Sequence, residues 1–284
     1  MTSIRVLRPG DEAALEAFLL PLTDSSMFLR ANHRIGGLED RGEFGQGTYV
    51  AAFEGEAIAG VIASFWQGNL SLQAPRHLAE LLRELPRLCP RPIAGLVGPW
   101  EQVEQARALL GMEQAPAKME SREALFTLEL QQLRVPEALA GGDVRCRLAG
   151  SGDLPALAQL RYDFLVESIG DAPGPETMKY ACEAVAKNAE HDVLFLLERG
   201  GEIVATSNFN ARLPDTVQIG AVFTPPALRG RGYARAVVAG SLLHARAQGA
   251  SRSVLFTEEE GPARRAYEAI GYRKVGQFGL VLFR

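Results

Sequence analysis

The sequence predicts a mixed α/β protein in which one structural unit occurs twice. Each half opens with an arginine-bearing alternating strand, a Gly-Asp turn and an Ala/Leu-rich helix. This pattern begins at Ile4 and occurs again, with weak sequence similarity, from Val144. Each half then passes through a helical stretch into a hairpin and a third strand. Because this order repeats, we interpret the chain as a tandem duplication of a unit of roughly 140 residues, which is an ordinary domain size.

Each half contains one predicted hairpin followed by one further strand. In the first half the hairpin is TYVAAFEGEAIAGVIASF, with a turn near Glu54 to Glu56, and the third strand is NLSLQA. In the second half the hairpin is DVLFLLERGGEIVATSNF, with Arg199 to Gly201 at its turn, and the third strand is VQIGAVFT. Pro136 and the Gly141-Gly142 pair interrupt the periodicity between the halves, so we assign one domain to residues 1–139 and another to residues 140–284.

Composition limits the classes of function. The chain has 284 residues, 47% hydrophobic content and a formal net charge of −4, which is typical of a globular protein and argues against a nucleic-acid partner. Three widely spaced cysteines, without a CxxC or Cys/His cluster, predict neither a disulfide framework nor a metal site and fit a reducing cytoplasm. The N-terminus lacks the apolar core of a signal peptide, and polar residues interrupt the long uncharged run 57–75, so we expect no membrane span.

The two halves differ after the third strand. The second half continues TPPALRGRGYARAVVAG, whereas the first continues APRHLAELL, with Pro75 expected to open a helix and no glycine present. From Pro225 to Thr257 there are five arginines, no lysine and no acidic residue. A helix that begins near Arg231 and ends at Gly249 would bury one face, formed by Ala234, Val237, Val238, Leu242 and Ala245.

The glycines at 230 and 232 therefore lie at the start of a helix. A first helical turn presents N–H groups without intrahelical partners, together with the positive end of the helix dipole, and both favour a bound phosphate. Glycine removes the β-carbons that would keep a pyrophosphate away from the backbone, and neighbouring arginines add charge-assisted contacts. Neither GxGxxG nor GxxxxGK[ST] is present, so the loop predicts pyrophosphate binding without support for NAD or ATP.

Arg229, Gly232 and Ala234 fit the Arg/Gln-x-x-Gly-x-Gly/Ala motif, and the loop resembles the acyl-CoA pyrophosphate loop of the GNAT N-acetyltransferase superfamily. The segments SRSVLF, GPARRAYEAIGYRKVG and FGLVLF then resemble the next strand, helix and closing strand of that family. More narrowly, the second half is similar to a bacterial group of tandem-GNAT predicted acetyltransferases. The resemblance implies two GNAT-like folds around mixed sheets, with an N-terminal copy that is degenerate because it lacks the CoA loop.

The resemblance also implies how CoA binds. In the family the strand before the loop splays from its neighbour, and the pantetheine arm pairs with the main chain that is set free. By position, the main chain of Val222, Phe223 and Thr224 would take this role and would polarise the thioester carbonyl. The pyrophosphate would lie on Arg229, Gly230, Arg231, Gly232, Tyr233, Ala234 and Arg235. The alternative is an ordinary buried strand ended by two prolines.

Two residues are candidates for catalysis. Tyr267 matches the family tyrosine that protonates the departing CoA thiolate, although a helical apolar stripe with Ala263 and Ile270 would equally pack its ring. An amine acceptor is largely protonated at neutral pH, so a general base is needed, and Glu167, at the end of the first helix of the second half, is a candidate. An exposed helix-end carboxylate and a water relay are the alternatives. Glu260 is not assigned to catalysis, because Thr257-x-x-Glu260 is interpreted as a capping box.

These observations predict a cytoplasmic acyl-CoA-dependent N-acyltransferase. The expected co-substrate is acetyl-CoA, no metal is required, and a small-molecule or peptide amine attacks the thioester directly. One alternative is an acyl-CoA sensor whose catalytic machinery has decayed. A second is a tandem-GNAT aminoacyl transferase that uses charged tRNA, which the net acidity disfavours. The first half is expected to cover the acceptor cleft or to complete a shared sheet.

Overall fold

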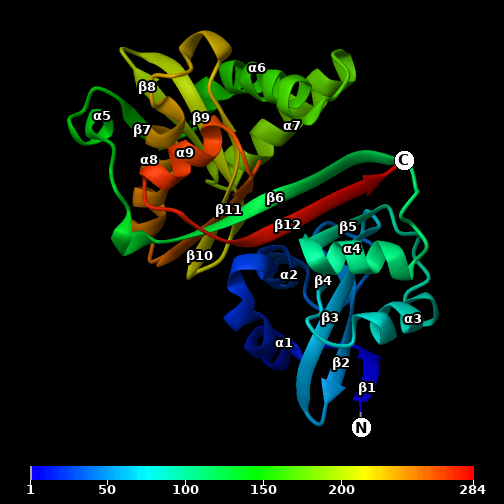
Figure 1. Cartoon of the computed structure of the whole chain (residues 1–284). Helices are drawn as coiled ribbons and strands as arrows, with labels where there is room; N and C mark the ends of the chain where they lie inside the picture. Colours follow the sequence, from blue (N-terminus) through cyan, green and yellow to red (C-terminus); the bar gives the residue numbers. More distant parts are fainter. Residues whose placement is uncertain (1) are drawn as a thin grey trace. The chain divides into compact units, whose positions relative to one another are not determined.

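The computed structural model describes residues 2–284, and its contacts divide the chain into two compact units (Figure 1). Unit 1 holds the chain up to Leu125 together with Phe256–Glu259 and Lys274–Arg284. Unit 2 holds Phe126–Leu255 and Glu260–Arg273. The last strand of the second half is thus part of unit 1. The division of the sequence into a repeat at residues 139 and 140 stays a prediction.

The sheet of unit 1 follows the sequence closely. Its strands β1 (Thr2–Val6), β2 (Gly47–Glu54), β3 (Ala57–Phe65) and β4 (Asn69–Gln73) are successive antiparallel neighbours, and β5 (Gly95–Pro99) runs parallel to β4. β12 (Arg273–Phe283) then pairs antiparallel with β5, with Leu282 opposite Gly95. β6 (Ala117–Glu129) lies beside β12 and belongs to unit 1 through Leu125 (Figure 1).

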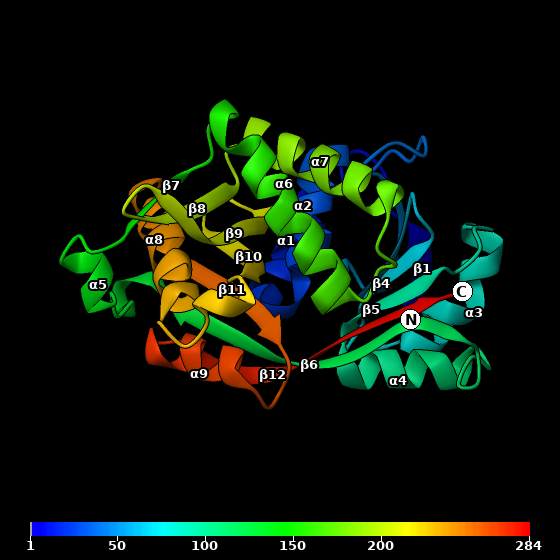
Figure 2. The ribbon, with the colours of Figure 1, turned by 90° about the horizontal axis from the view of Figure 1, so that it is seen from above.

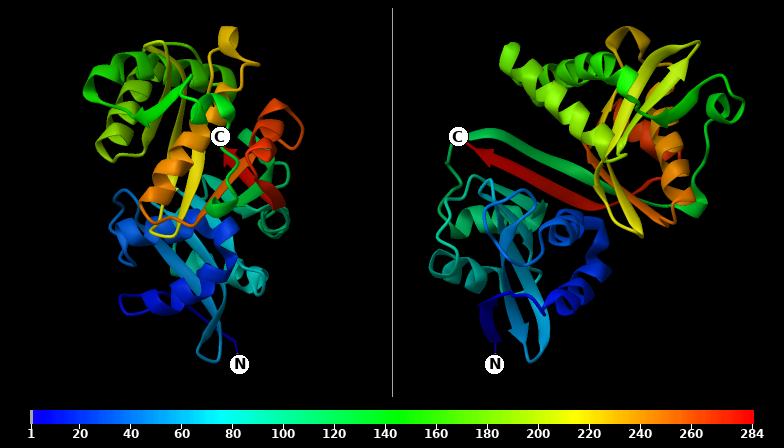
Figure 3. Two further views of the ribbon diagram at one scale, coloured as in Figure 1. Left: turned by 90° about the vertical axis from the view of Figure 1, so that its left-hand side faces the viewer. Right: turned by 180° about the vertical axis from the view of Figure 1, so that it is seen from behind.

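Helices cover both faces of this sheet (Figure 3). On one face α1 (Glu12–Leu19), a 3₁₀ turn (Leu20–Leu22) and α2 (Thr23–Gly36) bury a cluster that includes Leu15, Leu19 and Leu29. On the other face α3 (Leu78–Leu88) and α4 (Trp100–Leu109) bury Leu78, Leu81, Leu82, Leu85 and Val103. The spacing of these leucines is that of one apolar helix face, which is why each helix packs on the sheet.

The sheet of unit 2 has the same order of elements. β7 (Arg145–Leu148), β8 (Leu194–Arg199), β9 (Glu202–Arg212) and β10 (Thr216–Phe223) are successive antiparallel neighbours, and β11 (Arg252–Thr257) runs parallel to β10. The end of β6, from Phe126, borders β11 in this unit. The mixed α/β fold class is confirmed, and both hairpin turns lie where the sequence predicts them.

The helices of unit 2 occupy opposite faces of its sheet. α6 (Leu154–Phe164) and α7 (Pro175–Glu190), with a π-helical turn (Leu165–Ile169) between them, lie on one face (Figure 2). Both helices contribute to the cluster that buries Leu194 and Leu196. Phe195 lies between these leucines and points the other way, because side chains alternate along a strand. Its ring lies 5.3 Å from that of His244, on α8 (Tyr233–Ala247). The short helices α5 (Glu137–Ala140) and α9 (Pro262–Ala269), with 3₁₀ turns at Leu130–Gln132, Ser151–Asp153 and Pro226–Leu228, complete the unit.

Two local predictions are wrong. α3 begins at Leu78 and not at Pro75, because His77 before it adopts a left-handed conformation with φ of 65°. The capping box at Thr257 and Glu260 does not form, since Thr257 ends β11 and α9 begins at Pro262 after an N-cap at Gly261. Over the described residues, no helix combines the length and apolar character that crossing a bilayer requires.

Candidate active site

Strand β10 separates early from its parallel neighbour. The β10–β11 ladder pairs Thr216 with Arg252, Val217 with Ser253 and Gln218 with Val254, and it ends there. β10 nevertheless continues to Phe223. Past Gln218, the main chain on this side of β10 therefore has no ladder partner in β11, which is the splay that the sequence predicts.

A bulge lies in the same part of β10. The register against β9 shifts between Gly220, which faces Asn208, and Phe223, which faces Thr206. Within it, Ala221 has a φ of 45°, an uncommon value for a residue with a side chain. Bulges leave a residue unpaired and redirect the main chain, and they are frequent next to active sites. The partly exposed main chain at Ala221 and Val222 is therefore available to a ligand, whereas the side chains of Phe223 and Thr224 are buried.

The glycine loop follows directly and opens α8. Gly230 and Gly232 have φ values of 77° and 80°, which glycine adopts without strain. The first N–H that reaches a helical acceptor is that of Ala236, which donates to the Gly232 carbonyl at 3.1 Å. The N–H groups of the first turn, at Tyr233, Ala234 and Arg235, come before this first helical donor and face out of the helix end. The loop thus has the geometry of an anion site.

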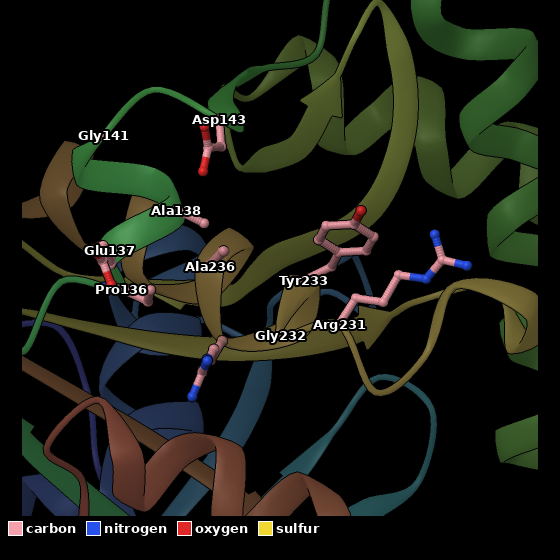
Figure 4. Close-up of a pocket in the computed structure, with 10 residues that line it drawn as sticks. Pro136, Glu137, Ala138, Gly141, Asp143, Arg231, Gly232, Tyr233 and Ala236 are labelled. Atoms are coloured by element: carbon pink, nitrogen blue, oxygen red, sulfur yellow. The ribbon is translucent and has the colours of Figure 1, made fainter.

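A pocket of about 380 Å³ lies against this helix end (Figure 4). One side is formed by the loop and α8, and the other by the segment between β6 and β7 that the sequence identifies only as a domain junction. Its lining residues are Pro136, Glu137, Ala138, Gly141, Asp143, Arg231, Gly232, Tyr233, Arg235 and Ala236. The Tyr233 ring is buried and its hydroxyl accepts a hydrogen bond from Arg199 at 2.9 Å, so this wall is held in place.

Arg229 and Glu167 come together in the structure. The Arg229 Nη2 atom lies 2.6 Å from Glu167 Oε1, and both side chains are partly exposed. The Arg229 Nε–H also donates to the Thr224 carbonyl at 3.0 Å, and its guanidinium lies 5.7 Å from the centre of the Phe223 ring. Arg229 thus joins the end of β10 to the π-helical turn. Glu167 is thus paired with an arginine of the loop. This ion pair would have to open before Glu167 could act as a general base.

Tyr267 lies in a buried position on α9. It is 7% exposed, and its ring meets that of Tyr272 edge-on at 6.1 Å. The Tyr272 hydroxyl shares a hydrogen bond of 2.5 Å with Ser253 Oγ on β11, and burial raises the pKa of Tyr272 far above its usual range. The ring of Tyr267 therefore packs as the apolar-stripe alternative expects. Proton donation by its hydroxyl stays a prediction.

Sequence reasoning missed several polar and aromatic residues near the bulge. Asn208 donates through Nδ2 to Asn210 Oδ1 at 3.0 Å, and the amide of Asn210 occupies the space that a β-carbon at Gly220 would need. The Phe164 ring of α6 meets the Phe223 ring edge-on at 6.3 Å. The available signal was the alternation of two asparagines in TSNFNAR, because asparagine is disfavoured inside strands.

Residues 154–272 match the family model described as the acetyltransferase (GNAT) family. This segment is a GNAT acetyltransferase domain. The match includes the splayed strand, the glycine loop and both catalytic candidates. No curated protein sequence matches the chain.

Solved structures support the fold over the whole length. A Drosophila protein from structural genomics aligns with a TM-score of 0.70 at 12% identity, covering 99% of this chain and 98% of that one. A tandem GNAT protein from the clavulanic acid biosynthesis pathway aligns with a TM-score of 0.57 at 10% identity, covering 99% and 98%. A GNAT-family acetyltransferase from Colwellia psychrerythraea gives 0.54 at 18% identity, covering 99% and 100%. At these identities the likeness concerns the fold alone.

Metal ligation has no candidate in residues 2–284, where no group of three or more histidine, cysteine, aspartate or glutamate side chains is placed to hold an ion.

Proposed function

We propose that the chain is an acetyl-CoA-dependent N-acyltransferase with one CoA site, located in unit 2. The observation that carries this proposal is the order of three features. The β10–β11 ladder ends at Gln218, the bulge at Ala221 follows, and the glycine loop then opens α8. Together they offer an extended main chain for a pantetheine arm and a helix end for a pyrophosphate.

The loop would bind the negative end of the co-substrate. The N–H groups of the first turn of α8 would donate to pyrophosphate oxygens, and Arg231 and Arg235, both exposed, would add charge. Arg229 would contribute as well, although in the free protein it is held by Glu167. The pantetheine arm would then follow the main chain of Val222, Phe223 and Thr224 toward the splayed part of β10.

The reaction would proceed by direct attack. When the acceptor nitrogen adds to the thioester carbon, negative charge develops on the carbonyl oxygen, and an N–H group at the β10 bulge would stabilise it. The C–S bond then breaks, and Tyr267 would give its proton to the leaving sulfur. The proton lost by the amine would pass to Glu167 once its ion pair with Arg229 opens, or to water.

Two measurements on the full chain test the proposal. Titration calorimetry with acetyl-CoA should give one site per chain, and two sites would contradict the assignment to unit 2 alone. Release of the CoA thiol should then follow when amines from a broad panel are added. Tight binding of acetyl-CoA without transfer to any amine would favour a sensor, and a salt-dependent shift of tRNA would favour aminoacyl transfer.

A further inference from the structure

Arg161 occupies an unusual position near the proposed thioester site. It lies on α6, one turn before Phe164, and its guanidinium carbon is 5.0 Å from the centre of the Phe164 ring. Phe164 in turn contacts Phe223, the last residue of β10. A row of three side chains thus connects the guanidinium of Arg161 to the strand end along which we place the acyl group.

The charge of Arg161 is poorly compensated. Its Nε atom is buried and finds no hydrogen-bond partner among the described residues. Burial lowers its pKa, and only the Tyr180 hydroxyl and the charge of Asp171 act against this effect. Arg161 is partly buried, and a partly buried charge without a carboxylate partner is costly, so a ligand that reaches its exposed atoms can supply the missing partner.

Arg147, which also belongs to unit 2, shows the contrast. Arg147 is 2.6 Å from Asp153 and 2.5 Å from Glu198, which is a full set of carboxylate partners. The acidic residues that follow Arg161 along its own segment are engaged elsewhere, because Asp163 accepts from Gln159 at 2.8 Å and Glu167 pairs with Arg229. Arg161, which is partly exposed, therefore has the Tyr180 hydroxyl and the more distant charge of Asp171 but no carboxylate of its own segment.

The sheet on this side of unit 2 offers neutral polar groups. Phe223 pairs with Thr206 on β9, and Asn208 and Asn210 follow on the same face as Thr206 because side chains alternate along a strand. Their amides can hydrogen-bond an amine or a carboxylate but bring no charge. An acceptor with a carboxylate would consequently meet Arg161, a wall of amides and aromatic rings, and Arg229, whose charge is already paired with Glu167.

We infer that the acceptor is an amine that carries a carboxylate, of the free amino acid class, and that Arg161 binds this carboxylate. The inference deepens the proposed function and rests on it. A planar guanidinium matches a carboxylate with two parallel hydrogen bonds, which gives orientation as well as affinity. Held this way, the amine end of the acceptor is directed past Phe164 and Phe223 toward β10.

The test compares matched amines at saturating acetyl-CoA. Glycine, β-alanine and γ-aminobutyrate are each paired with the corresponding amide, which keeps the amine and removes the charge. The wild type should show a kcat/KM at least about tenfold higher for one or more of the carboxylates, as expected for a charge-assisted pair. Arg161→Gln should abolish this preference, and Arg161→Lys should retain part of it, while the KM for acetyl-CoA stays the same.

Arg145→Gln is the matched control, because it removes an exposed arginine from edge strand β7 of the same unit. It should leave the carboxylate preference unchanged, and thermal melting should report that all variants fold. Equal kcat/KM for acids and amides in the wild type would overturn the inference. So would an Arg161→Gln variant that lowers both equally, which is the result of a purely structural role.

The inference and the proposed function can fail separately. If no amine is acetylated, calorimetry with the same amino acids in the presence of acetyl-CoA still measures the carboxylate site. Binding by the wild type that is lost in Arg161→Gln would then support the site while the transferase proposal fails. Absence of binding by the wild type would overturn both.

Discussion

The connection from the strand after the hairpin to the next helix differs between the two units, although the elements around it follow the same order. In unit 2 it spans residues 224–232, between β10 and α8, and contains Gly230 and Gly232. In unit 1 it spans only residues 74–77, between β4 and α3, and contains no glycine. Each helix starts after a left-handed residue, which is Gly232 in one unit and His77 in the other.

Unit 1 fills its version of the site with its own side chains. The Ala74 N–H, just past β4, donates to Gln102 Oε1 of α4 at 2.7 Å, and Gln73 accepts from Ser25 at 3.0 Å. The His77 ring lies 2.8 Å from a carboxylate oxygen of Glu54. Main-chain and helix-end positions that are available to a ligand in unit 2 are thus already occupied in unit 1. We therefore expect that the shared fold accepts a coenzyme in unit 2 and that side chains prevent it in unit 1.

The largest effect is expected from a substitution that blocks the proposed pyrophosphate site in the glycine loop of unit 2. Gly232→Glu places a carboxylate at the pyrophosphate position, so acetyl-CoA affinity should fall by about 100-fold or more, which corresponds to about 3 kcal/mol. Gly200→Glu is the control, because Gly200 also has a positive φ, at 59°, but lies in the β8–β9 turn. Calorimetry compares the two variants. Unchanged affinity in a folded Gly232→Glu protein would mean that the pyrophosphate binds elsewhere.

The helix after the parallel strand allows a second comparison. Gly111 and Gly271 both follow this helix with positive φ, and four residues earlier unit 1 has Arg107, tied to Glu120 at 2.7 Å, where unit 2 has Tyr267. Tyr267→Phe should keep acetyl-CoA binding while kcat falls toward the lower end of the 10²- to 10⁴-fold typical of general acid catalysis, or less, because a CoA thiol leaves readily.

The control for this experiment is Tyr272→Phe, which removes the hydrogen bond to Ser253 from a buried site. It should lower the melting temperature with little effect on turnover, whereas Tyr267→Phe should do the opposite. Identical turnover in wild type and Tyr267→Phe, with the chemical step limiting, would remove the tyrosine from the mechanism.

Substitutions of Glu167 and of Arg229 should separate the binding of acetyl-CoA from proton transfer. Their ion pair is about half exposed, so breaking it should cost less than about 1 kcal/mol of stability. Glu167→Gln should lower kcat by about tenfold at constant acetyl-CoA affinity if the carboxylate accepts the proton, whereas Arg229→Gln should weaken acetyl-CoA binding. Full activity of Glu167→Gln would assign proton removal to water.

The smallest effect concerns the closed site of unit 1. The hydrogen bond to Glu54 raises the pKa of His77, so the folded state holds this proton more tightly than the unfolded chain. The contribution to stability is complete below the unfolded pKa of about 6.5 and is lost as the pH rises through the raised folded value. Melting curves of wild type and His77→Gln should therefore converge with rising pH. A gap that widens at high pH would contradict the pair.

The sequence predicts those parts of the fold that depend on local chemistry. The turns at Glu54 to Glu56 and Arg199 to Gly201, and the start of α8 after the glycines, follow from residues that are neighbours in the chain. The ion pair of Glu167 with Arg229 joins exposed residues far apart in sequence, and no periodicity marks it. The same holds for Arg161, whose proposed role rests on its contact with Phe164 and on the absence of a partner for its Nε atom.

The pairing of β12 with β5 places a constraint on biosynthesis. Unit 1 needs Lys274–Arg284, which are synthesised after all of unit 2, to cover the edge of β5. Domains commonly fold in the order of their synthesis, but here unit 1 stays incomplete until the whole of unit 2 has been synthesised. A nascent or truncated chain would expose β5 as an unpaired edge, and such edges promote aggregation. An interruption of synthesis within unit 2 would therefore leave unit 1 incomplete as well.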